Sequence, residues 1–373
     1  MFSVLLYNKD VRYTIDPASG RMWFPVKRAA AVLFAFFLLS CVCSCAGADG
    51  GPVIVSLGDS YSGGEGLEPF YGQDAEMAVK CQDPDWLAHR SGKCWPGMLT
   101  LPGVEGTMKD HRGEHWFLAA ASGADSHNLF LLTEDEIRDG KTAEQEKEYS
   151  RDGISGTAWL APQLDIFDEL DAKGLKADYV TVTIGGNDIG FKKIVTMSMM
   201  GVTVFYPGDT IQEKAESLMK EMYERPGIRA RIKRAYTDTA ARAGSQACII
   251  VAGYPSLMAP EGCEGIISAE SAQIMNAAGV LLNAELQDIA EECRAEGINI
   301  RFVSVAEAFD GHGAYSDDPY INPVIHGPRE QDLKIPAAVS IYSMHPNAQG
   351  VEAYARCVQE VIDLLEAEKT GGR

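Results

Sequence analysis

Residues 53–66 have the sequence VIVSLGDSYSGGEG, an apolar run that ends abruptly at Gly58, Asp59 and Ser60. Short, continuous apolar runs are typical of strands that are buried on both faces of a parallel sheet. The glycines allow a sharp turn and a close approach of the backbone, so we expect Ser60 to stand at the carboxyl end of the strand. A serine held there is a candidate nucleophile. The segment alone is equally compatible with a glycine-rich turn capped by a serine.

Similar apolar runs recur along the chain and alternate with helical patterns. The further strands are predicted at 116–121, 179–184, 248–252 and 300–305. The helices are predicted at 162–173, at 211–243 with a break at Pro226-Gly227, at 270–296 and at 348–368. This alternation predicts an α/β fold, a three-layer α/β/α sandwich with right-handed crossovers. Ligands of such sheets bind at the carboxyl ends of the strands.

The sequence after residue 48 has no linker that would divide it, so we expect 49–373 to form a single domain with three insertions. The first, at 134–153, is charged and favours a solvated face. The second, at 195–228, contains MSMMGVTVF and is either a mobile apolar lid or a buried helical insertion. The third, at 310–338, is a loop rich in Gly, Pro and Asp.

Composition excludes several classes of protein. The 373 residues are 46% hydrophobic and 23% charged, a balance that excludes a disordered chain, a collagen and a coiled coil. The net charge of −20 repels phosphate backbones, so we expect no nucleic-acid partner. We expect a monomer that acts on a small-molecule or lipid substrate.

The first 48 residues resemble an export signal. An apolar run at 29–40 follows Lys27 and Arg28 and precedes the small-residue site at 46–48. The run is short for a bilayer span, although a single membrane anchor is the alternative. Met22 would open a signal of ordinary length. Cys41 and Cys45 each lie in an imperfect lipobox, so either a cleaved, secreted protein or a chain tethered through a lipidated cysteine is expected.

Six of the nine cysteines follow residue 48. An even number of cysteines in an exported chain suggests disulfides. Cys81 and Cys94 close a short loop, and we expect these two to pair. Cys248 lies in the run ACIIVAGY and is expected to be a buried thiol in a core strand.

Three more candidate residues follow predicted elements. Gly123 comes after the second strand and Asn187 after the third, where a backbone N–H and a side-chain amide can stabilise an oxyanion. A structural glycine and an Asx-turn are the alternatives. His345 precedes Pro346, which keeps it out of the last helix and on a loop, where it can serve as a general base for Ser60.

Together, the motifs GDSYS, SGA, GGND and HPNAQG resemble blocks I, II, III and V of the SGNH (GDSL) hydrolases. The resemblance covers about residues 53–365, and block I is similar to that of secreted actinobacterial lipases and esterases. It implies a flavodoxin-like five-stranded parallel sheet of order 2-1-3-4-5. It also implies ester hydrolysis through an acyl-enzyme without a cofactor or metal. Ser60 would be the nucleophile and His345 the base. The N–H groups of Ser60 and Gly123 and the Asn187 side chain would form the oxyanion hole.

One position departs from this pattern. Many members of the family have an Asp three residues before the histidine, where this chain has Tyr342. Some group must still accept the Nδ1–H bond of the imidazole. We expect the backbone carbonyl of Tyr342 to do so, with Asp317 or Asp318 as the alternative.

Other patterns are weaker. His111-Arg112-Gly113-Glu114-His115 matches an inverted zinc-peptidase motif, but Gly113 interrupts the helix that such a motif needs, and we expect no metal. The sequence therefore predicts an exported serine esterase or lipase. The alternatives are a polysaccharide O-acetylesterase, an acyltransferase and a catalytically inactive surface binding module.

Overall fold

A computed structural model of the protein describes residues 51–73, 83–130, 160–190, 195, 207–224, 227–325, 340 and 342–371. All of these belong to one compact unit, Gly51–Arg373. The predicted signal at 1–48 and the predicted insertion at 134–153 lie outside the described residues, as do parts of the insertions at 195–228 and 310–338.

The centre of the unit is a five-stranded sheet in the order β2-β1-β3-β4-β5. All four strand pairs are parallel. The strands are β1 (Ile54–Gly58), β2 (Trp116–Leu118), β3 (Tyr179–Thr183), β4 (Cys248–Ala252) and β5 (Ile300–Val303). The predicted fold class and strand order are confirmed. Every residue of the first four strands is buried, which explains their continuous apolar runs.

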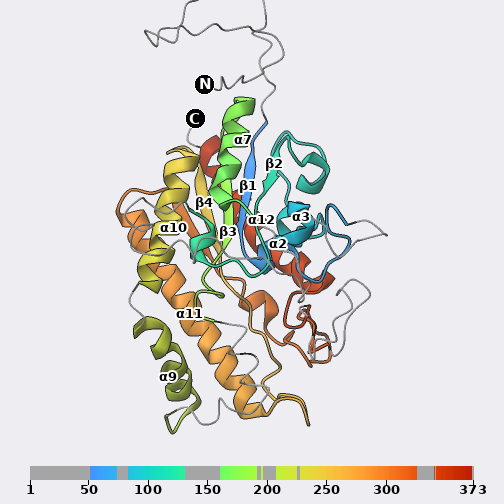
Figure 1. Ribbon diagram of the computed structural model, residues 1–373, viewed down its shortest axis with the longest axis vertical. Coiled ribbons are helices and arrows are strands. Elements are labelled where there is room, and N and C mark those ends of the chain that lie inside the picture. The colour runs from blue at the N-terminus through green and yellow to red at the C-terminus, as the bar shows by residue number, and fades with distance from the viewer. Residues whose placement is uncertain are drawn as a thin grey trace, which may run out of the picture. The chain divides into compact units, whose positions relative to one another are not determined.

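Helices cover both faces of this sheet (Figure 1). α7 (Ile166–Lys173), α10 (Ile228–Ala243) and α11 (Ala269–Ala295) lie in front of the sheet, and α12 (Ala348–Gly371) lies behind it. Three one-turn helices follow β1: α2 (Ser60–Gly63), α3 (Pro84–Leu87) and α4 (Trp95–Met98). Short 3-10 turns occur at Met108–His111, Ser126–Asn128, Gln163–Asp165 and Glu307–Phe309. The result is the predicted three-layer sandwich.

The break predicted at Pro226-Gly227 separates two helices, α9 (Ile211–Glu224) and α10. Gly227 has a φ of 109° at the start of α10, a left-handed conformation that favours glycine. α9 packs along α11. The described part of the insertion at 195–228 therefore contains a helix packed on the body of the protein.

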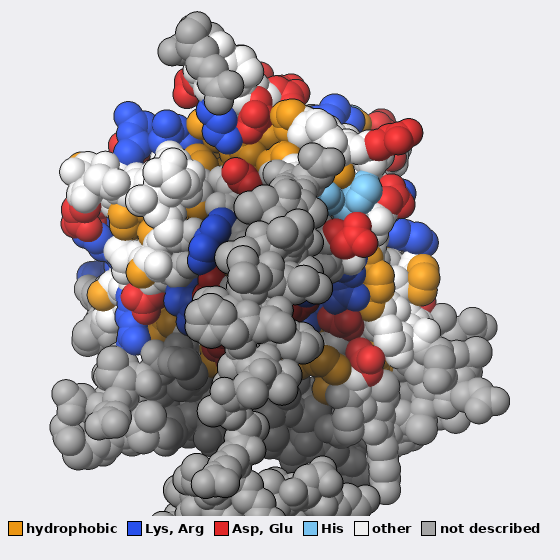
Figure 2. All heavy atoms as spheres, turned by 90° about the horizontal axis from the view of Figure 1, so that it is seen from above, with side chains coloured by type: hydrophobic (Ala, Val, Ile, Leu, Met, Phe, Trp, Pro, Cys, Tyr) orange, Lys and Arg blue, Asp and Glu red, His pale blue; other side chains and the backbone are white. Residues whose placement is uncertain are grey.

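Side chains of opposite charge are interspersed on the described surface at the amino ends of the strands (Figure 2). The residues singled out by the sequence all follow the opposite, carboxyl ends. Within the ranges described, no helix is both long enough and apolar enough to cross a membrane.

Candidate active site

The turn after β1 is built around Gly58, Asp59 and Ser60. Gly58 has a φ of 120°, and a Cβ there would lie 2.2 Å from the carbonyl oxygen of Thr183 on the neighbouring strand, so only glycine fits. The Asp59 carboxylate caps α2 by accepting a 3.0 Å bond from the N–H of Tyr61. Ser60 is thereby the first residue of a one-turn helix at the carboxyl end of the central strand.

Ser60 and His345 meet although 285 residues separate them in sequence. The Oγ of Ser60 lies 2.8 Å from Nε2 of His345. Asn347 begins the last helix, because its side chain accepts a 3.0 Å bond from the N–H of Gly350. His345 itself is held on the preceding loop by its carbonyl, which accepts a 2.8 Å bond from the N–H of Asn322. The two residues that the sequence predicts as nucleophile and base are therefore in hydrogen-bonding contact.

The carbonyl that faces Nδ1 of His345 belongs to Ser343, at 3.1 Å, and not to Tyr342 as predicted. The carbonyl in contact with the imidazole therefore lies one residue further along the chain than predicted. Met344 has a φ of 64°, a left-handed conformation that turns the Ser343 carbonyl back toward the imidazole. The Tyr342 side chain is buried, and its hydroxyl donates to Glu68.

The Asp318 carboxylate contacts other side chains. It lies 3.4 Å from Nδ1 of His312 and accepts a 3.2 Å bond from the amide of Gln349. The structure therefore supports the carbonyl of Ser343, rather than this aspartate, as the group that orients His345. A proton on Nδ1 that is donated to the carbonyl leaves Nε2 as an acceptor for the Ser60 hydroxyl.

Gly123 and Asn187 come together beside this pair. The N–H of Ala124 donates to the carbonyl of Ala121 at 3.1 Å, and Gly123 within this turn has a φ of 76°. A β-turn with a positive φ at its third residue requires glycine there. The amide nitrogen of Asn187 donates to the carbonyl of Ala124 at 2.8 Å, which directs its NH₂ group, not its oxygen, toward the turn. Both predicted oxyanion donors thus lie at adjoining strand ends.

Asp59 is also the centre of a buried polar network. Its carboxylate accepts from the Thr183 hydroxyl at 2.8 Å and from the hydroxyl of Tyr254, which follows β4. The Tyr254 oxygen in turn accepts a 3.0 Å bond from the N–H of Gly186, next to Asn187. Burial raises the pKa of Asp59 to about 6, although these hydrogen bonds oppose the shift.

Asp188 has a comparable structural role on the other side of Asn187. It is fully buried and accepts bonds from both the hydroxyl and the N–H of Ser126, the latter at 3.0 Å. Burial raises the pKa of this carboxyl as well. Among the residues described, neither aspartate is part of a cluster of three potential metal ligands.

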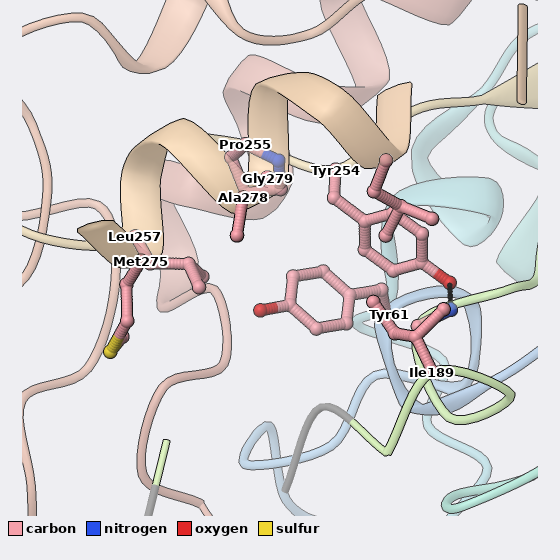
Figure 3. A pocket seen from close by; sticks show the side chains of 10 residues that line it. Tyr61, Ile189, Tyr254, Pro255, Leu257, Met275, Ala278 and Gly279 are labelled. Atoms are coloured by element: carbon pink, nitrogen blue, oxygen red, sulfur yellow. Dashed lines mark hydrogen bonds between the residues drawn. The ribbon is translucent and has the colours of Figure 1, made fainter. Parts of the chain in front are cut away.

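An apolar cavity adjoins this site (Figure 3). Its free volume is small, about 20 Å³, and a wider space of about 400 Å³ around it includes open solvent. Its wall next to the site is formed by Tyr61, Gly186 and Ile189, and its far wall by Met275 and Gly279 of α11. Figure 3 shows the rings of Tyr61 and Tyr254 beside each other, and their centroids are 5.3 Å apart. The cavity begins one residue from Ser60 and one residue from Asn187.

Comparison with solved structures finds similar folds among hydrolases. An extracellular lipase from Streptomyces rimosus is 21% identical, with a TM-score of 0.48 over 84% of this chain and 98% of the lipase. A phospholipase A1 from Streptomyces albidoflavus is 19% identical, with a TM-score of 0.49 over the same shares of the two chains. An acetylxylan esterase from Geobacillus stearothermophilus is 16% identical, with a TM-score of 0.37 over 84% of this chain and 94% of the esterase.

No protein-family model and no curated protein matches the sequence. The chemistry that we assign to the chain depends on its own side chains.

The predicted disulfide between Cys81 and Cys94 involves one residue, Cys81, that lies outside the described residues. Cys94 is a fully buried free thiol, and burial raises its pKa to about 12. The pairing stays a prediction. Cys248 is a buried free thiol in β4, as expected.

Two parts of the site were not predicted from the sequence. Tyr254 follows a predicted strand, but nothing local indicates that its hydroxyl reaches Asp59. For the cavity wall on α11, the sequence contained one indication, Gly279. Glycine is unfavourable inside a helix and often marks a packing or binding position.

Replacing Asp59 with Asn should change how stability depends on pH. The pKa of Asp59 is about 6 in the folded protein and 3.8 in its ordinary state, so the folded protein binds the proton more tightly. The contribution of Asp59 to the free energy of unfolding is therefore greatest below pH 4. It falls by about 3 kcal/mol as the pH rises past 6.

Denaturant unfolding of the native protein and Asp59→Asn at pH 4 and pH 7 measures this effect. We expect the variant to gain stability relative to the native protein between the two pH values. A difference in stability that stays constant with pH would contradict the assignment.

Proposed function

We propose that the protein is an exported serine esterase of the SGNH type that hydrolyses carboxylic esters with an apolar acyl chain. The observation that carries this proposal is the 2.8 Å contact between Ser60 Oγ and His345 Nε2. In this contact the imidazole is oriented by the Ser343 carbonyl. A hydroxyl, a base and a group that orients the base form the arrangement required for nucleophilic acyl transfer.

The reaction follows from this geometry. Ser60 Oγ attacks the ester carbonyl carbon while its proton passes to Nε2 of His345. The imidazolium then gives this proton to the leaving alcohol oxygen as the C–O bond of the ester breaks. A water molecule loses a proton to His345 and attacks the acyl carbon. The proton returns to Ser60 Oγ as the acid is released, so no cofactor is needed.

The negative charge on the carbonyl oxygen would be stabilised at the adjoining turns. The backbone N–H groups of Ser60 and Gly123 and the side-chain amide of Asn187 are the proposed donors. The bond from Asn187 to the Ala124 carbonyl supports this role, because it fixes the amide with its nitrogen toward the turn that contains Gly123.

The apolar cavity favours a lipid or fatty-acyl ester over an acetyl ester. Its lining is almost entirely apolar, and it begins at Tyr61, next to the nucleophile. A longer acyl chain would place its methylene groups against this apolar lining. A polysaccharide O-acetylesterase is the second candidate, and the preferred chain length separates the two. A binding module that has lost activity is disfavoured by the contact between Ser60 and His345.

We further propose that the chain is exported through its first 48 residues and acts outside the cell as a monomer. Either cleavage after Ala48 or lipidation at Cys41 or Cys45 would follow export. Labelling of the expressed protein with a radioactive fatty acid, beside variants of the two cysteines, distinguishes these outcomes.

The first experiment is hydrolysis of p-nitrophenyl esters from acetate to palmitate by the purified protein and by Ser60→Ala. We expect the native protein to prefer acyl chains longer than acetyl and the variant to lose more than about 10³-fold in kcat. A folded native protein that is inactive across the series would overturn the esterase proposal. Activity on acetate alone would favour the O-acetylesterase.

Gly279→Phe should shorten the preferred acyl chain. A Cβ at Gly279 would meet no atom within 4 Å, so a larger side chain can enter the cavity without disturbing the helix. We expect the kcat/KM for octanoate and longer esters to fall at least about tenfold, with that for acetate within about twofold. Gly279→Ala is the matched control and should keep the native profile. An unchanged profile in the Phe variant would show that the acyl chain lies elsewhere.

Asp318→Asn should leave ester hydrolysis within about twofold of the native rate, because Asp318 contacts His312 and Gln349 and not His345. In triads that depend on a carboxylate, the same kind of change costs about 10⁴-fold in kcat. Steady-state kinetics with one ester distinguishes orientation of His345 by the Ser343 carbonyl from orientation by Asp318. A large loss of kcat in the variant would identify Asp318 as the orienting group.

A further inference from the structure

The buried side chains of Glu65 and His89 and the half-buried Ser122 form a cluster beside the site that takes no part in the reaction described above. The side chains of Glu65 and His89 are 0% and 4% exposed, and Nδ1 of His89 lies 2.6 Å from Oε2 and 2.7 Å from Oε1 of Glu65. The same Oε2 accepts a hydrogen bond from the hydroxyl of Ser122. A carboxylate placed this deeply is expensive to bury unless donors surround it.

The surroundings of His89 indicate where its proton lies. The ring stacks on Phe70 at 4.5 Å, and its Nε2 is buried without a hydrogen-bond partner among the described residues. A proton on Nε2 would be an unsatisfied buried donor, which costs more than an unsatisfied acceptor nitrogen in this apolar contact. The proton therefore belongs on Nδ1, directed at Glu65, whose carboxyl group accepts from both His89 and Ser122.

The cluster joins the three loops that build the site. The backbone N–H of Glu65 donates to the carbonyl of Ser60 at 3.1 Å, directly behind the nucleophile. The N–H of Ser122 donates to the carbonyl of Ala88, the neighbour of His89, at 2.9 Å. The backbone N–H of Ser122 is thus bound to Ala88, and its hydroxyl is bound to Glu65, whose own N–H bonds the carbonyl of Ser60.

Ser122 is the second residue of the turn from Ala121 to Ala124, and Gly123 is the third. A positive φ at Gly123 alone makes this a type II turn. Its central peptide contains the N–H of Gly123, and that peptide can turn over to the type I orientation when nothing opposes the change. Glycine accepts both orientations without strain. The contacts of Ser122 with Glu65 and Ala88 fix the plane of this peptide.

We propose that Glu65 is a positioning residue for the oxyanion hole. Oriented by His89, it holds Ser122 so that the Gly123 N–H faces the reacting carbonyl oxygen. This inference rests on the proposed esterase function. It adds a buried carboxylate that acts on the turn from Ala121 to Ala124, whereas a backbone carbonyl contacts His345. The bond between Glu65 and Ser122 helps to keep the Gly123 donor in place.

Three variants test the proposal. Ser122→Ala removes the bond to Glu65 and keeps the backbone bond to Ala88. Ser122→Thr keeps a hydroxyl and should rescue the activity. Ser91→Ala is the control, because Ser91 is a buried serine in the same region, outside the turn, whose hydroxyl bonds the backbone carbonyls of Leu67 and Pro69.

We expect Ser122→Ala to lower kcat for a p-nitrophenyl ester about ten- to a hundredfold, with little change in KM, since a misplaced donor matters only in the transition state. Its affinity for an alkyl boronic acid, whose adduct with Ser60 places an oxygen in the oxyanion hole, should fall by a similar factor. Ser91→Ala should lose a similar amount of thermal stability and keep both values near native.

Equal kcat and equal boronic-acid affinity in Ser122→Ala and Ser91→Ala would overturn the positioning role. A loss of kcat in Ser122→Ala without any loss of boronic-acid affinity would also overturn it. Failure of the esterase proposal has a different signature, since the native protein would then hydrolyse no ester and its turnover would not depend on Ser60.

Discussion

The buried carboxylate of Asp59 is the interaction on which the rest of the site depends. One side chain caps the helix that begins with Ser60, bonds Thr183 at the end of β3 and accepts the hydroxyl of Tyr254 after β4. Parallel strands bring their carboxyl ends to one edge, but the loops that follow need a common partner to keep a fixed spacing. Asp59 is that partner, and the pKa raised by burial shows the energetic cost of placing it there.

Most of the fold follows from patterns that depend on short stretches of sequence. The residues of the first four strands are all buried because both faces are covered, so their apolar runs can be recognised without knowing their neighbours. The break between α9 and α10 falls where the sequence Pro226-Gly227 predicts it, and Gly227 has a left-handed φ there. The positions of Ser60 and His345 were predictable from nearby residues: Gly58 permits the sharp turn before Ser60, and Pro346 keeps His345 out of the last helix.

The parts that could not be predicted depend on contacts between distant segments or on one backbone angle. The carbonyl of Ser343, and not that of Tyr342, faces His345 because Met344 has a left-handed conformation. Methionine rarely adopts this conformation, and no neighbouring residue in the sequence indicates it. The contact of Tyr254 with Asp59 spans 195 residues. The bond from Ser122 to Glu65 likewise joins the SGA and GDSYSGGEG segments, and the sequence of each segment by itself indicates only a turn.

A dyad that lacks a carboxylate places a stronger demand on the oxyanion hole. A backbone carbonyl can fix the tautomer of His345, but its partial charge stabilises the imidazolium less than a carboxylate would. The charge on the substrate oxygen must then be met by well-placed donors. Buried carboxylates are nevertheless present beside this site, and they contact the turns instead of the histidine. Asp59 and Glu65 lie behind the nucleophile, and Asp188 ties the Asn187 loop to Ser126.

The loop from Gly185 to Gly190 couples this electrostatic arrangement to the choice of substrate. Asn187 supplies a proposed donor, while Gly186 and Ile189 form a wall of the apolar cavity. A Cβ at Gly186 would lie 3.1 Å from the ring of Tyr254, so the loop packs directly on the tyrosine that bonds Asp59. An acyl chain that fills the cavity would press on the same loop that presents the amide. Binding energy from the chain can therefore be used to align the oxyanion donor, which raises kcat as well as affinity.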